Sequence, residues 1–454
     1  MSSKTFATVL TAALGLTVLA ACATDSGGDT TADGKTVVKV ALEPGQDKSA
    51  VDAFNARVAQ FEQANPGIDL VVEEFKWDPT KFTAQLAGGT LPDVVTVPFT
   101  DGRGLIERHQ IADISGDVTQ LPYAGKFNPE VAKTGQDASG KQQAIPIAAY
   151  TQALHYNRTL FKQAGLDPDR PPSTWDEVRA DAKQIAERTG AAGYAQMTKD
   201  NTGGWILVTQ DYAFGGRTEK LDGDKATATI DTPQLRQVLQ NLRAMRWDDN
   251  SMGANFLYDW NGINQDFAAG RIGMYVSGGG NYKDLLSQNA IKPADYGVTA
   301  LPLTGPDAGA LGGGTLAVVN VKASKKTQSA AVKWIDFYYL RKLTDEAAAQ
   351  GDAKTNADAK QAVGSPELPV FDKATYDERL RWIGQYVNVP LPQMTPYTSK
   401  MFDQQLLPEP TRATQKVYGV LDTVVQKVLT DRGADVNALL ADAQTQAQAL
   451  LDRS

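Results

Sequence analysis

Short apolar runs alternate with amphipathic segments along most of the chain. Residues 36–42 (TVVKVAL) are rich in β-branched side chains and predict a strand. Apolar residues at helical spacing follow between Val51 and Phe61, and Asn65-Pro66 ends that pattern. The alternation continues in two further strands and an intervening helix, at residues 68–75, 94–97 and 82–87. This β-α-β-α-β order predicts a parallel sheet with right-handed crossovers.

The same alternation reaches the end of the chain. Thr174 and Glu177 have the spacing of a capping box and open one helix. Further strands and helices are expected at residues 153–156, at 158–164, from Ala330 onward and at 437–451. The chain is therefore predicted to be an α/β protein, although the order of its elements does not say which strands share a sheet.

The first residues predict a secretion signal. Lys4 supplies a positive charge, and residues 6–20 form an apolar run too short to span a membrane. Cys22 is the only cysteine of the 454 residues, and it ends a Leu-Ala-Ala-Cys sequence that resembles a bacterial lipobox. We expect residues 1–21 to be removed, Cys22 to be lipidated and residues 22–35 to form a flexible tether. An ordinary signal peptide with a cysteine at its cleavage site is the alternative.

Composition favours a globular protein that binds neither nucleic acid nor an anionic membrane surface. Hydrophobic residues make up 42% of the chain and charged residues 22%, which is ordinary for a folded domain. Without residues 1–21 the chain has 44 basic and 53 acidic residues, a net charge of −9. Contact with the membrane is therefore expected through the lipid anchor only. The remaining chain is longer than one hydrophobic core usually serves, so two domains are expected.

Sequence motifs give little support to an enzyme. The two histidines, His109 and His155, belong to no HExxH pattern, and neither GxSxG nor GxxxxGK[ST] occurs. A secreted glycosidase stays open as an alternative, because it needs only two carboxylates. We expect no catalysis, no cofactor and no metal, and we expect His155 to be a structural residue of a strand.

Residues 146–178 (PIAAYTQALHYNRTLFKQAGLDPDRPPSTWDEV) resemble the hinge region of extracellular solute-binding proteins of the maltose-binding type. In that family a strand crosses between two lobes and is followed by a YN-x-x-LF helix and a PP-x-TW-x-E cap. Four other segments resemble the family in the same order: FEQANPGIDLVVEEF, LAGGTLPDVVTV, NQDFAAGRIGMYVSGGGN and YGVTALPLTGPDAGALGGGTLAVV. Together these segments extend the resemblance from about Thr36 to the C-terminus.

The resemblance implies a two-lobe, periplasmic-binding-protein-like (type II) α/β fold with crossing strands and a ligand cleft between the lobes. Lobe one would comprise residues 36–150 and 316–365, and lobe two residues 151–315 and 366–454. It also implies a monomeric receptor of an ABC importer at the extracellular face of the cell membrane. Such a receptor would capture a sugar, an oligosaccharide in our interpretation, and deliver it to permease subunits that are driven by a separate ATPase.

Sugars present flat C–H faces and many hydroxyls, so we expect aromatic rings beside carboxylates and amides at the loops that edge the cleft. The motif positions of the family point to Glu43, Asp101, Tyr150, Asn281 and Gly313. Residue type in a loop-like context adds a second group of candidates: Gln46, Trp77, Asp78, Phe99, Trp205, Asp211, Trp260 and Trp382.

Other small solutes stay open as ligands, namely a polyamine, a peptide, a glycerophosphodiester or ferric iron. Tyr338-Tyr339 is the kind of pair that some iron-binding hinge proteins use. Its position beside Trp334 and Phe337 on a helical pattern favours core packing instead. The candidate loops hold no cluster of basic residues, which disfavours a strongly anionic solute.

Overall fold

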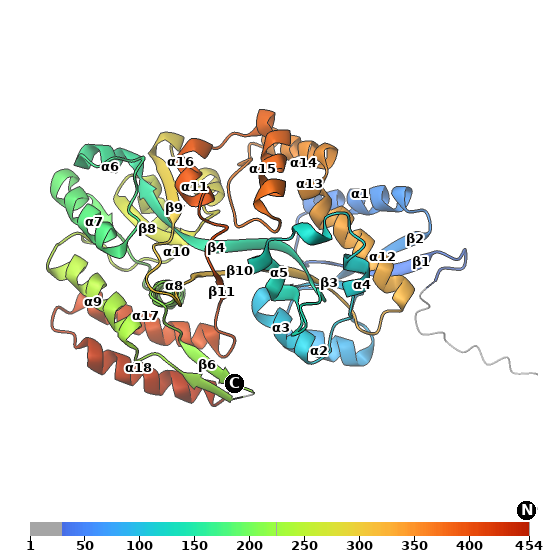
Figure 1. The fold of residues 1–454 in the computed structure, drawn as a ribbon, viewed down its shortest axis with the longest axis horizontal. Coiled ribbons are helices and arrows are strands. Elements are labelled where there is room, and N and C mark those ends of the chain that lie inside the picture. The colour runs from blue at the N-terminus through green and yellow to red at the C-terminus, as the bar shows by residue number, and fades with distance from the viewer. Residues whose placement is uncertain (1–29, 224, 454) are drawn as a thin grey trace, which may run out of the picture.

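The computed structural model describes residues 30–223 and 225–453, which are organised around one continuous sheet (Figure 1). The expected signal peptide, the expected lipidation site Cys22 and residues 23–29 of the tether lie outside the described residues. Nine strands of the described chain join in this sheet, whose main path has the order β2-β1-β3-β10-β4-β8-β5. In addition, β11 pairs with β10 and β9 pairs with β4. The predicted α/β class is confirmed.

The first three strands form the parallel unit that the apolar pattern predicts. They are β1 (Thr36–Leu42), β2 (Ile68–Glu74) and β3 (Val94–Pro98), connected by α1 (Lys48–Ala64) and α2 (Pro79–Gly88). β1 runs parallel to both β2 and β3. Helix α1 begins after Asp47, whose carboxylate accepts a hydrogen bond from the Ala50 N–H at 2.9 Å. It ends before Asn65, as Asn65-Pro66 predicts.

Two long antiparallel strands connect the two ends of the molecule. They are β4 (Ile145–Asn157) and β10 (Ala310–Val319), which pair from Ala317–Ile145 to Gly312–Thr151. At one end β10 pairs with β3, while β4 continues at the other end between β8 (Ile272–Gly278) and β9 (Tyr296–Ala300). A much shorter strand, β11 (Leu406–Pro408), lies parallel to β10. The sheet therefore contains crossing strands, as the family resemblance implies.

Helices cover both faces of the sheet at each end (Figure 1). The predicted capping box is present, because Thr174 accepts from the Glu177 N–H at 3.1 Å and Glu177 accepts from the Thr174 N–H at 3.1 Å. The remaining elements are α3 (Phe99–Glu107), α4 (Ser115–Val118), α5 (Pro129–Ala132), α6 (Arg158–Ala164), α7 (Trp175–Thr189), β5 (Ala192–Tyr194), α8 (Thr202–Ala213), β6 (Glu219–Asp222), β7 (Lys225–Ala228), α9 (Pro233–Trp247), α10 (Trp260–Ala268), α11 (Tyr282–Asn289), α12 (Lys325–Ile335), α13 (Arg341–Thr344), α14 (Glu346–Asp358), α15 (Lys373–Trp382), α16 (Leu391–Thr398), α17 (Thr414–Thr430) and α18 (Val436–Leu451).

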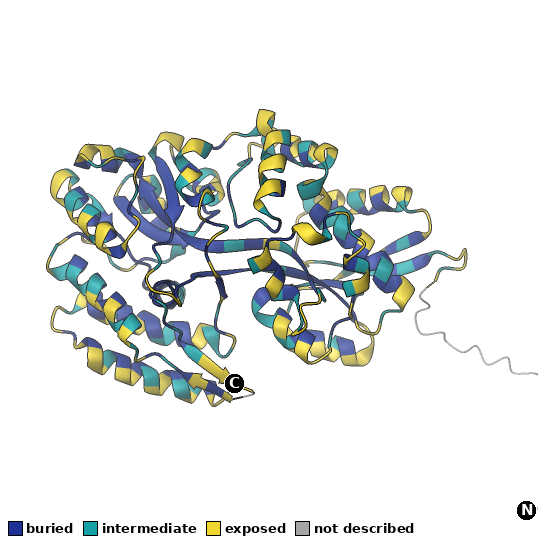
Figure 2. Ribbon diagram, in the orientation of Figure 1, coloured by how far each residue is buried: buried dark blue, intermediate teal, exposed yellow. Residues whose placement is uncertain are grey.

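Buried side chains gather at both ends of the crossing strands (Figure 2). The larger core contains Ala153 of β4 and the apolar faces of α8, α9, α17 and α18. The other end contains Ile145 of β4 and also Phe371, whose ring stacks on Phe127 with centroids 4.9 Å apart. Phe371, which lies beyond the expected lobe boundary at residue 365, therefore belongs to an aromatic cluster of the first end. Along the chain, the next buried residue of the larger core after Leu311 is Val389.

The adjacent pair Tyr338-Tyr339 packs against the core of the first end. The Tyr338 ring stacks on Trp334 with centroids 4.9 Å apart, and burial raises the phenol pKa of both tyrosines. Core packing, the interpretation that the sequence favours for this pair, is confirmed. Among residues 30–223 and 225–453 there is no group of three or more His, Cys, Asp or Glu side chains placed to hold a metal ion.

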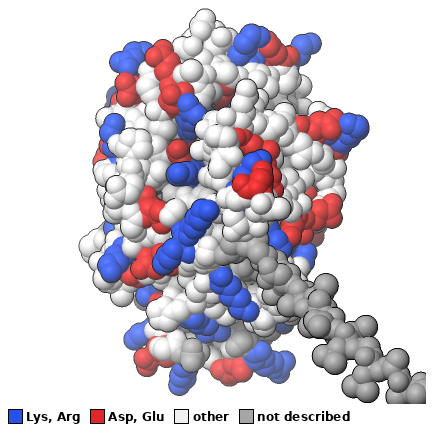
Figure 3. Space-filling model, turned by 90° about the vertical axis from the view of Figure 1, so that its right-hand side faces the viewer, with Lys and Arg blue, Asp and Glu red and all other residues white. Residues whose placement is uncertain are grey.

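Acidic and basic side chains are interspersed on the end of the molecule that carries β1 and β2 (Figure 3). Several of them form ion pairs, for example Lys39 with Glu73 at 3.1 Å. No helix of the described part has the length and apolar character needed to cross a membrane.

Candidate functional site

A cleft of about 460 Å³ lies beside the crossing strands and draws its walls from both ends of the molecule. Its floor includes residues of β4 and β10, and its walls come from the start of α8, the start of α10, the end of β8, and α11. The lining residues are Ala148, Ala149, Tyr150, Trp205, Trp260, Ser277, Gly278, Gly280, Asn281, Lys283, Asp284, Gly314, Thr315 and Glu367. Four of the predicted site residues, Tyr150, Trp205, Trp260 and Asn281, are thereby brought together.

Glycines allow the crossing strands to approach each other and the Tyr150 ring to lie flat over them. A Cβ atom on Gly312 would stand 2.2 Å from the Tyr150 carbonyl oxygen, and one on Gly314 would stand 2.5 Å from the Phe99 ring. A Cβ on Gly313 would lie 2.9 Å from the Tyr150 hydroxyl. Gly313 is therefore a support beneath Tyr150, and any larger residue there would displace the ring.

Two tryptophans enter the cleft from helix starts, although their sequence context suggested loops. Trp205 lies in the first turn of α8, which is held by Asp422 of α17: its carboxylate accepts from the Asn201 and Gly204 N–H groups, both at 2.7 Å. Trp260 is the first residue of α10, and the cap residue Asp259 accepts from Gly262 N–H at 2.7 Å. Capped helix starts fix the position of both indole rings more firmly than free loops would.

Asn281 presents a buried amide at the end of β8. Its Nδ2 donates to the side-chain Oδ1 of Asn264 and to the Tyr275 hydroxyl, each at 2.8 Å. Its Oδ1 is buried and has no hydrogen-bond partner in the described chain. Because a buried acceptor without a donor is costly, this atom is suited to receive a hydroxyl hydrogen from a ligand.

Glu409 is a candidate that the sequence did not indicate. It follows β11 and comes close enough to Tyr150 that its charge, together with burial, raises the pKa of that phenol. Burial also raises the pKa of the Glu409 carboxyl, with the Trp205 indole in partial opposition. The only signal in the sequence is an acidic residue after a three-residue apolar run, 406–408 being LLP, and that run is too short to predict a strand.

The carboxyl ends of the first three strands collect a second set of predicted residues. Glu43 follows β1 and pairs with Lys76 at 3.4 Å, and Trp77 follows β2 and packs on Phe82 with centroids 5.3 Å apart. Burial raises the pKa of Asp101, while the Thr100 hydroxyl and the Trp77 indole oppose the rise. These side chains do not line the cleft of 460 Å³. They lie on the neighbouring edge, since Pro98 at the end of β3 pairs with the cleft residue Thr315.

Three other predicted site residues in the first end of the chain lie away from the cleft. Asp78 is the cap of α2, where its carboxylate accepts from Lys81 N–H at 2.7 Å. Phe99 is buried in the core rather than open to the cleft, because α3 begins immediately after β3 and no loop intervenes. Gln46 lies exposed in the loop that precedes α1 and has no contact with the cleft lining.

Two predicted site residues at the other end also lie away from the cleft. Asp211 is 0% exposed and lies inside the larger core, because α8 is apolar on nearly all sides and is buried against α17 and β10. Trp382 packs with Ala349, Ala353 and Ile383 in a small cluster between α14 and α15. Neither residue lines the cleft.

His155 is structural, as the sequence predicts. It is fully buried on β4, with Nδ1 at 3.0 Å from the Tyr296 hydroxyl and Nε2 at 3.0 Å from the Gly278 carbonyl oxygen. Burial lowers the pKa of the imidazole to about 4, and the carbonyl groups of Ser277 and Gly278 oppose that shift only in part. The neutral imidazole therefore connects β4 to β8 and β9 immediately below the cleft.

Comparison with known proteins identifies similar chains. A sequence model described as bacterial extracellular solute-binding protein matches residues 56–369. A putative binding protein of Brucella abortus (strain 2308) is 28% identical over 331 residues, which are 70% of this chain and 77% of that protein. The sn-glycerol-3-phosphate-binding periplasmic protein UgpB of Yersinia pestis bv. Antiqua (strain Antiqua) is 33% identical over 125 residues, 26% of this chain and 28% of that protein. The crystal structure of the cyclic alpha-maltosyl-1,6-maltose binding protein from Arthrobacter globiformis superimposes with a TM-score of 0.67 at 23% identity, covering 93% of this chain and 100% of that one, which shows a shared fold.

Proposed function

Because the chain belongs to the bacterial extracellular solute-binding proteins, we propose that it is the sugar receptor of an ABC importer. It captures a sugar, in our interpretation an oligosaccharide, in the cleft beside the crossing strands. It then delivers the sugar to permease subunits that are driven by a separate ATPase. Members of this family and the similar proteins described above are binding proteins. The proposed role is accordingly capture without catalysis.

One observation carries this proposal: aromatic rings and polar groups converge in a single cleft. Tyr150, Trp205 and Trp260 supply apolar faces for the C–H surfaces of sugar rings. Asn281 has an unpartnered buried acceptor, and Glu409 places a carboxyl beside two of the rings. A hydroxyl group of a bound sugar would satisfy the Asn281 acceptor, which has no hydrogen-bond partner in the described chain.

The crossing strands would act as the hinge of this receptor. Apart from these strands, the two ends of the molecule meet in the cleft at the Lys283–Glu367 ion pair, whose Nζ and Oε1 lie 2.5 Å apart. A ligand that contacts both ends binds the closed arrangement more tightly than an open one, and only this difference can shift the molecule toward closure. The permease would recognise the closed shape.

Trp260→Ala should weaken sugar binding by about 1–2 kcal/mol, which is roughly a fivefold to thirtyfold rise in Kd. The reason is the loss of one stacking face without removal of a hydrogen bond that the core needs. A calorimetric screen of mono- and oligosaccharides, with glycerophosphocholine, spermidine, a peptide mixture and Fe³⁺ in parallel, identifies the ligand first. Titration of the variant with that ligand then measures the change.

Trp382→Ala is the matched control, because it removes the same side chain from the cluster between α14 and α15. It should lower the melting temperature and leave the Kd unchanged. Equal losses of affinity in both variants would place the ligand elsewhere. Binding of a solute other than a sugar, with no response to any sugar, would replace the sugar receptor by a receptor for that solute.

A glycerophosphodiester receptor is the second candidate. It is favoured by the similarity over 125 residues to a protein named for glycerol-3-phosphate binding. The presence of Lys283 in the cleft is compatible with a phosphate, although its ion pair with Glu367 leaves no net charge on that pair. The parallel titration with glycerophosphocholine separates the two candidates.

We also propose that Cys22 carries the lipid that keeps the receptor at the extracellular face of the membrane. The support is the Leu-Ala-Ala-Cys sequence after an apolar run, together with membership of an extracellular family. Cys22→Ser in a Gram-positive host should abolish incorporation of an alkyne fatty acid and release the protein into the medium. Retention of both the label and the membrane fraction in that variant would contradict lipidation at Cys22.

A further inference from the structure

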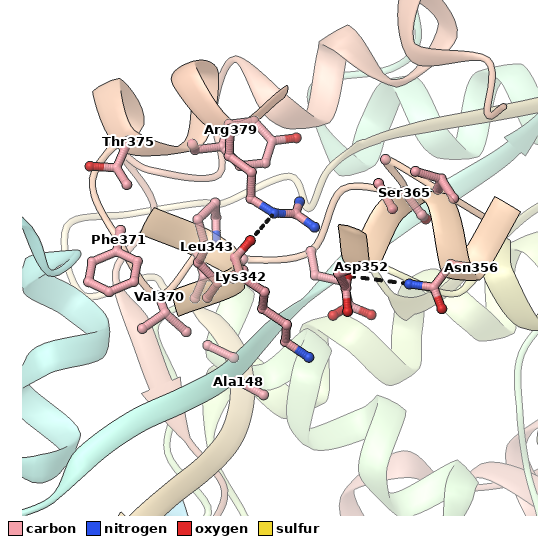
Figure 4. Close-up of a pocket in the computed structure, with 18 of the residues that line it drawn as sticks. Ala148, Lys342, Leu343, Asp352, Asn356, Ser365, Val370, Phe371, Thr375 and Arg379 are labelled. Atoms are coloured by element: carbon pink, nitrogen blue, oxygen red, sulfur yellow. Dashed lines mark hydrogen bonds between the residues drawn. The ribbon is translucent and has the colours of Figure 1, made fainter. Parts of the chain in front are cut away.

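A second pocket of about 420 Å³ adjoins the cleft. Its walls come from α13, α14, α15 and residues 362–371, and residues 147–149 of β4 form its base (Figure 4). It shares Ala148, Ala149, Lys283 and Glu367 with the cleft, so the Lys283–Glu367 pair stands between the two spaces. We call this space the α15 pocket. A ligand that extends past this pair from the cleft would enter the α15 pocket.

The α15 pocket carries more positive than negative charge. Lys283 and Glu367 neutralise each other, which leaves Lys342 and Arg379 against Asp352. The Arg379 guanidinium points from α15 toward Asp352 on α14 (Figure 4). In the described part of the chain, neither Lys342 nor Arg379 has a carboxylate within 4.0 Å. An excess of one positive charge is notable in a chain whose net charge is −8.

The Arg379 guanidinium has only one hydrogen bond in the described structure. Its Nε donates to the Lys342 carbonyl oxygen at 3.3 Å, so both terminal nitrogens remain available. Burial lowers the pKa of this guanidinium, and the charge of Asp352 opposes that shift only in part. The Arg379 side chain is partly exposed, so its terminal nitrogens can be reached by a ligand. An oxyanion bound between these two nitrogens would accept a hydrogen bond from each.

Two hydroxyl groups in the wall of the α15 pocket are also unsatisfied. Ser365 Oγ and Tyr376 Oη are buried, and neither has a hydrogen-bond partner in the described residues. Burial raises the pKa of Tyr376 to about 12, with the charge of Arg379 in opposition, which shows how near the two groups lie. Each hydroxyl is a donor that an anion could use after a small closure of the wall.

We propose that the α15 pocket is an anion subsite that receives a carboxylate or phosphate group carried by the sugar in the cleft. This inference rests on the proposed function and narrows its substrate class to acidic sugars. Arg379 holds two oxygens of the anion through parallel N–H···O bonds, and Lys342 adds the second positive charge. Sugar rings occupy the aromatic cleft on the other side of the Lys283–Glu367 pair.

The basic residues of this subsite come from α13 and α15, not from the loops that edge the cleft. They stand thirty-seven positions apart in the sequence, as the Lys342–Arg379 hydrogen bond records. The sequence disfavours a strongly anionic solute only because the loops at the cleft hold no cluster of basic residues. Folding places these two cations beside the cleft, so one anionic group on an otherwise neutral sugar can be accommodated.

Calorimetry with matched pairs of sugars tests this subsite. Glucose is compared with glucuronate and with glucose 6-phosphate, and maltose is compared with maltobionate. Each sugar is titrated at 50 and at 300 mM NaCl. Inorganic phosphate and glycerol 3-phosphate serve as anions without a sugar ring. The acidic member of at least one pair should bind about tenfold more tightly than the neutral member at low salt, and the preference should shrink at high salt. A preference for glucuronate or maltobionate shows that the pocket binds a carboxylate. A preference for glucose 6-phosphate shows that it binds a phosphate.

Arg379→Gln and Lys342→Gln should each reduce this preference to about onefold to threefold and leave the neutral sugar's Kd unchanged. Lys342 is exposed, so its variant keeps the test valid if Arg379→Gln lowers the melting temperature. Arg381→Gln is the matched control, because it removes the same charge from α15 at an exposed position paired with Glu378. It should retain the full preference.

The outcomes separate this inference from the proposed function. Neutral sugars that bind while acidic partners gain nothing overturn the anion subsite and leave the sugar receptor standing. An unchanged preference in both Arg379→Gln and Lys342→Gln also overturns it. Binding of inorganic phosphate or glycerol 3-phosphate that depends on Arg379, without binding of any sugar, supports the subsite and overturns the sugar receptor.

Discussion

Asp211→Asn should stabilise the protein against urea by about 4 kcal/mol at pH 8, and by only about 1 kcal/mol at pH 4.5. The carboxyl of Asp211 is 0% exposed, and neither oxygen has a hydrogen-bond partner in the described chain. Burial raises its pKa to about 7, although the charge of Arg217 opposes the rise. An asparagine of the same shape carries no charge to bury.

The direction of the pH dependence follows from the raised pKa. The unfolded carboxyl titrates near pH 4, whereas the folded one holds its proton to about pH 7. Between these values the folded state binds a proton that the unfolded state has lost. The stabilising contribution of Asp211 is therefore complete below about pH 4 and disappears as the pH rises to 7. Asp211→Asn removes this loss of stability because the asparagine side chain does not ionise.

Asp442→Asn is the control, because it removes the same charge from an exposed position on α18. Its urea midpoint should differ from that of the wild type by the same small amount at both pH values. A gain for Asp211→Asn that is equal at pH 4.5 and pH 8 would show that Asp211 is not protonated in the folded state at low pH. A loss of sugar affinity in the same variant would return Asp211 to the binding site.

The supersecondary structure was predictable from the sequence because each signal is local. β-Branched runs, apolar residues at helical spacing, Asn65-Pro66 and the capping box at Thr174 all act within one or two turns of the chain. The pattern could not predict that β4 and β10 join all strands but β6 and β7 into one sheet, since that depends on pairing between residues more than 150 positions apart. It also placed Trp205 and Trp260 in loops, because short helices with small residues at their starts look like loops.

The candidate site was predictable in part, from family motifs beside the crossing strands and from residue type. Tyr150 and Asn281 belong to such motifs, and both line the cleft. Residue type found Trp205 and Trp260, which line the cleft. It also selected Asp211 and Trp382, which are buried or packed elsewhere, since aromatic and acidic residues also serve in cores and caps. Glu409 was missed because its position depends on β11 pairing with β10 far along the chain.

In the wild type, His155 should account for a loss of about 3 kcal/mol in the free energy of unfolding as the pH falls. His155→Gln should remove this loss. The folded pKa of His155 is lowered to about 4, whereas an unfolded histidine titrates near 6.5. Stability from the neutral imidazole is therefore complete above about pH 6.5 and is lost as the pH falls to 4. The variant should be less stable than the wild type at pH 7, because the contacts of His155 with Tyr296 and Gly278 are altered, and the difference should narrow toward pH 4.

His155 and Asp211 should mask each other in the wild-type protein. Between about pH 4 and pH 6.5, His155 makes stability rise with pH, whereas Asp211 makes it fall, each by about 1.4 kcal/mol per pH unit. Relative to the wild type, Asp211→Asn should therefore make the slope of the profile more positive and His155→Gln should make it more negative, and the double variant should restore the wild-type slope. His109→Asn, which replaces the exposed histidine, should leave the wild-type profile unchanged. A wild-type profile that His155→Gln shifts downward without a change of slope would mean that the imidazole is charged in the folded protein over this range.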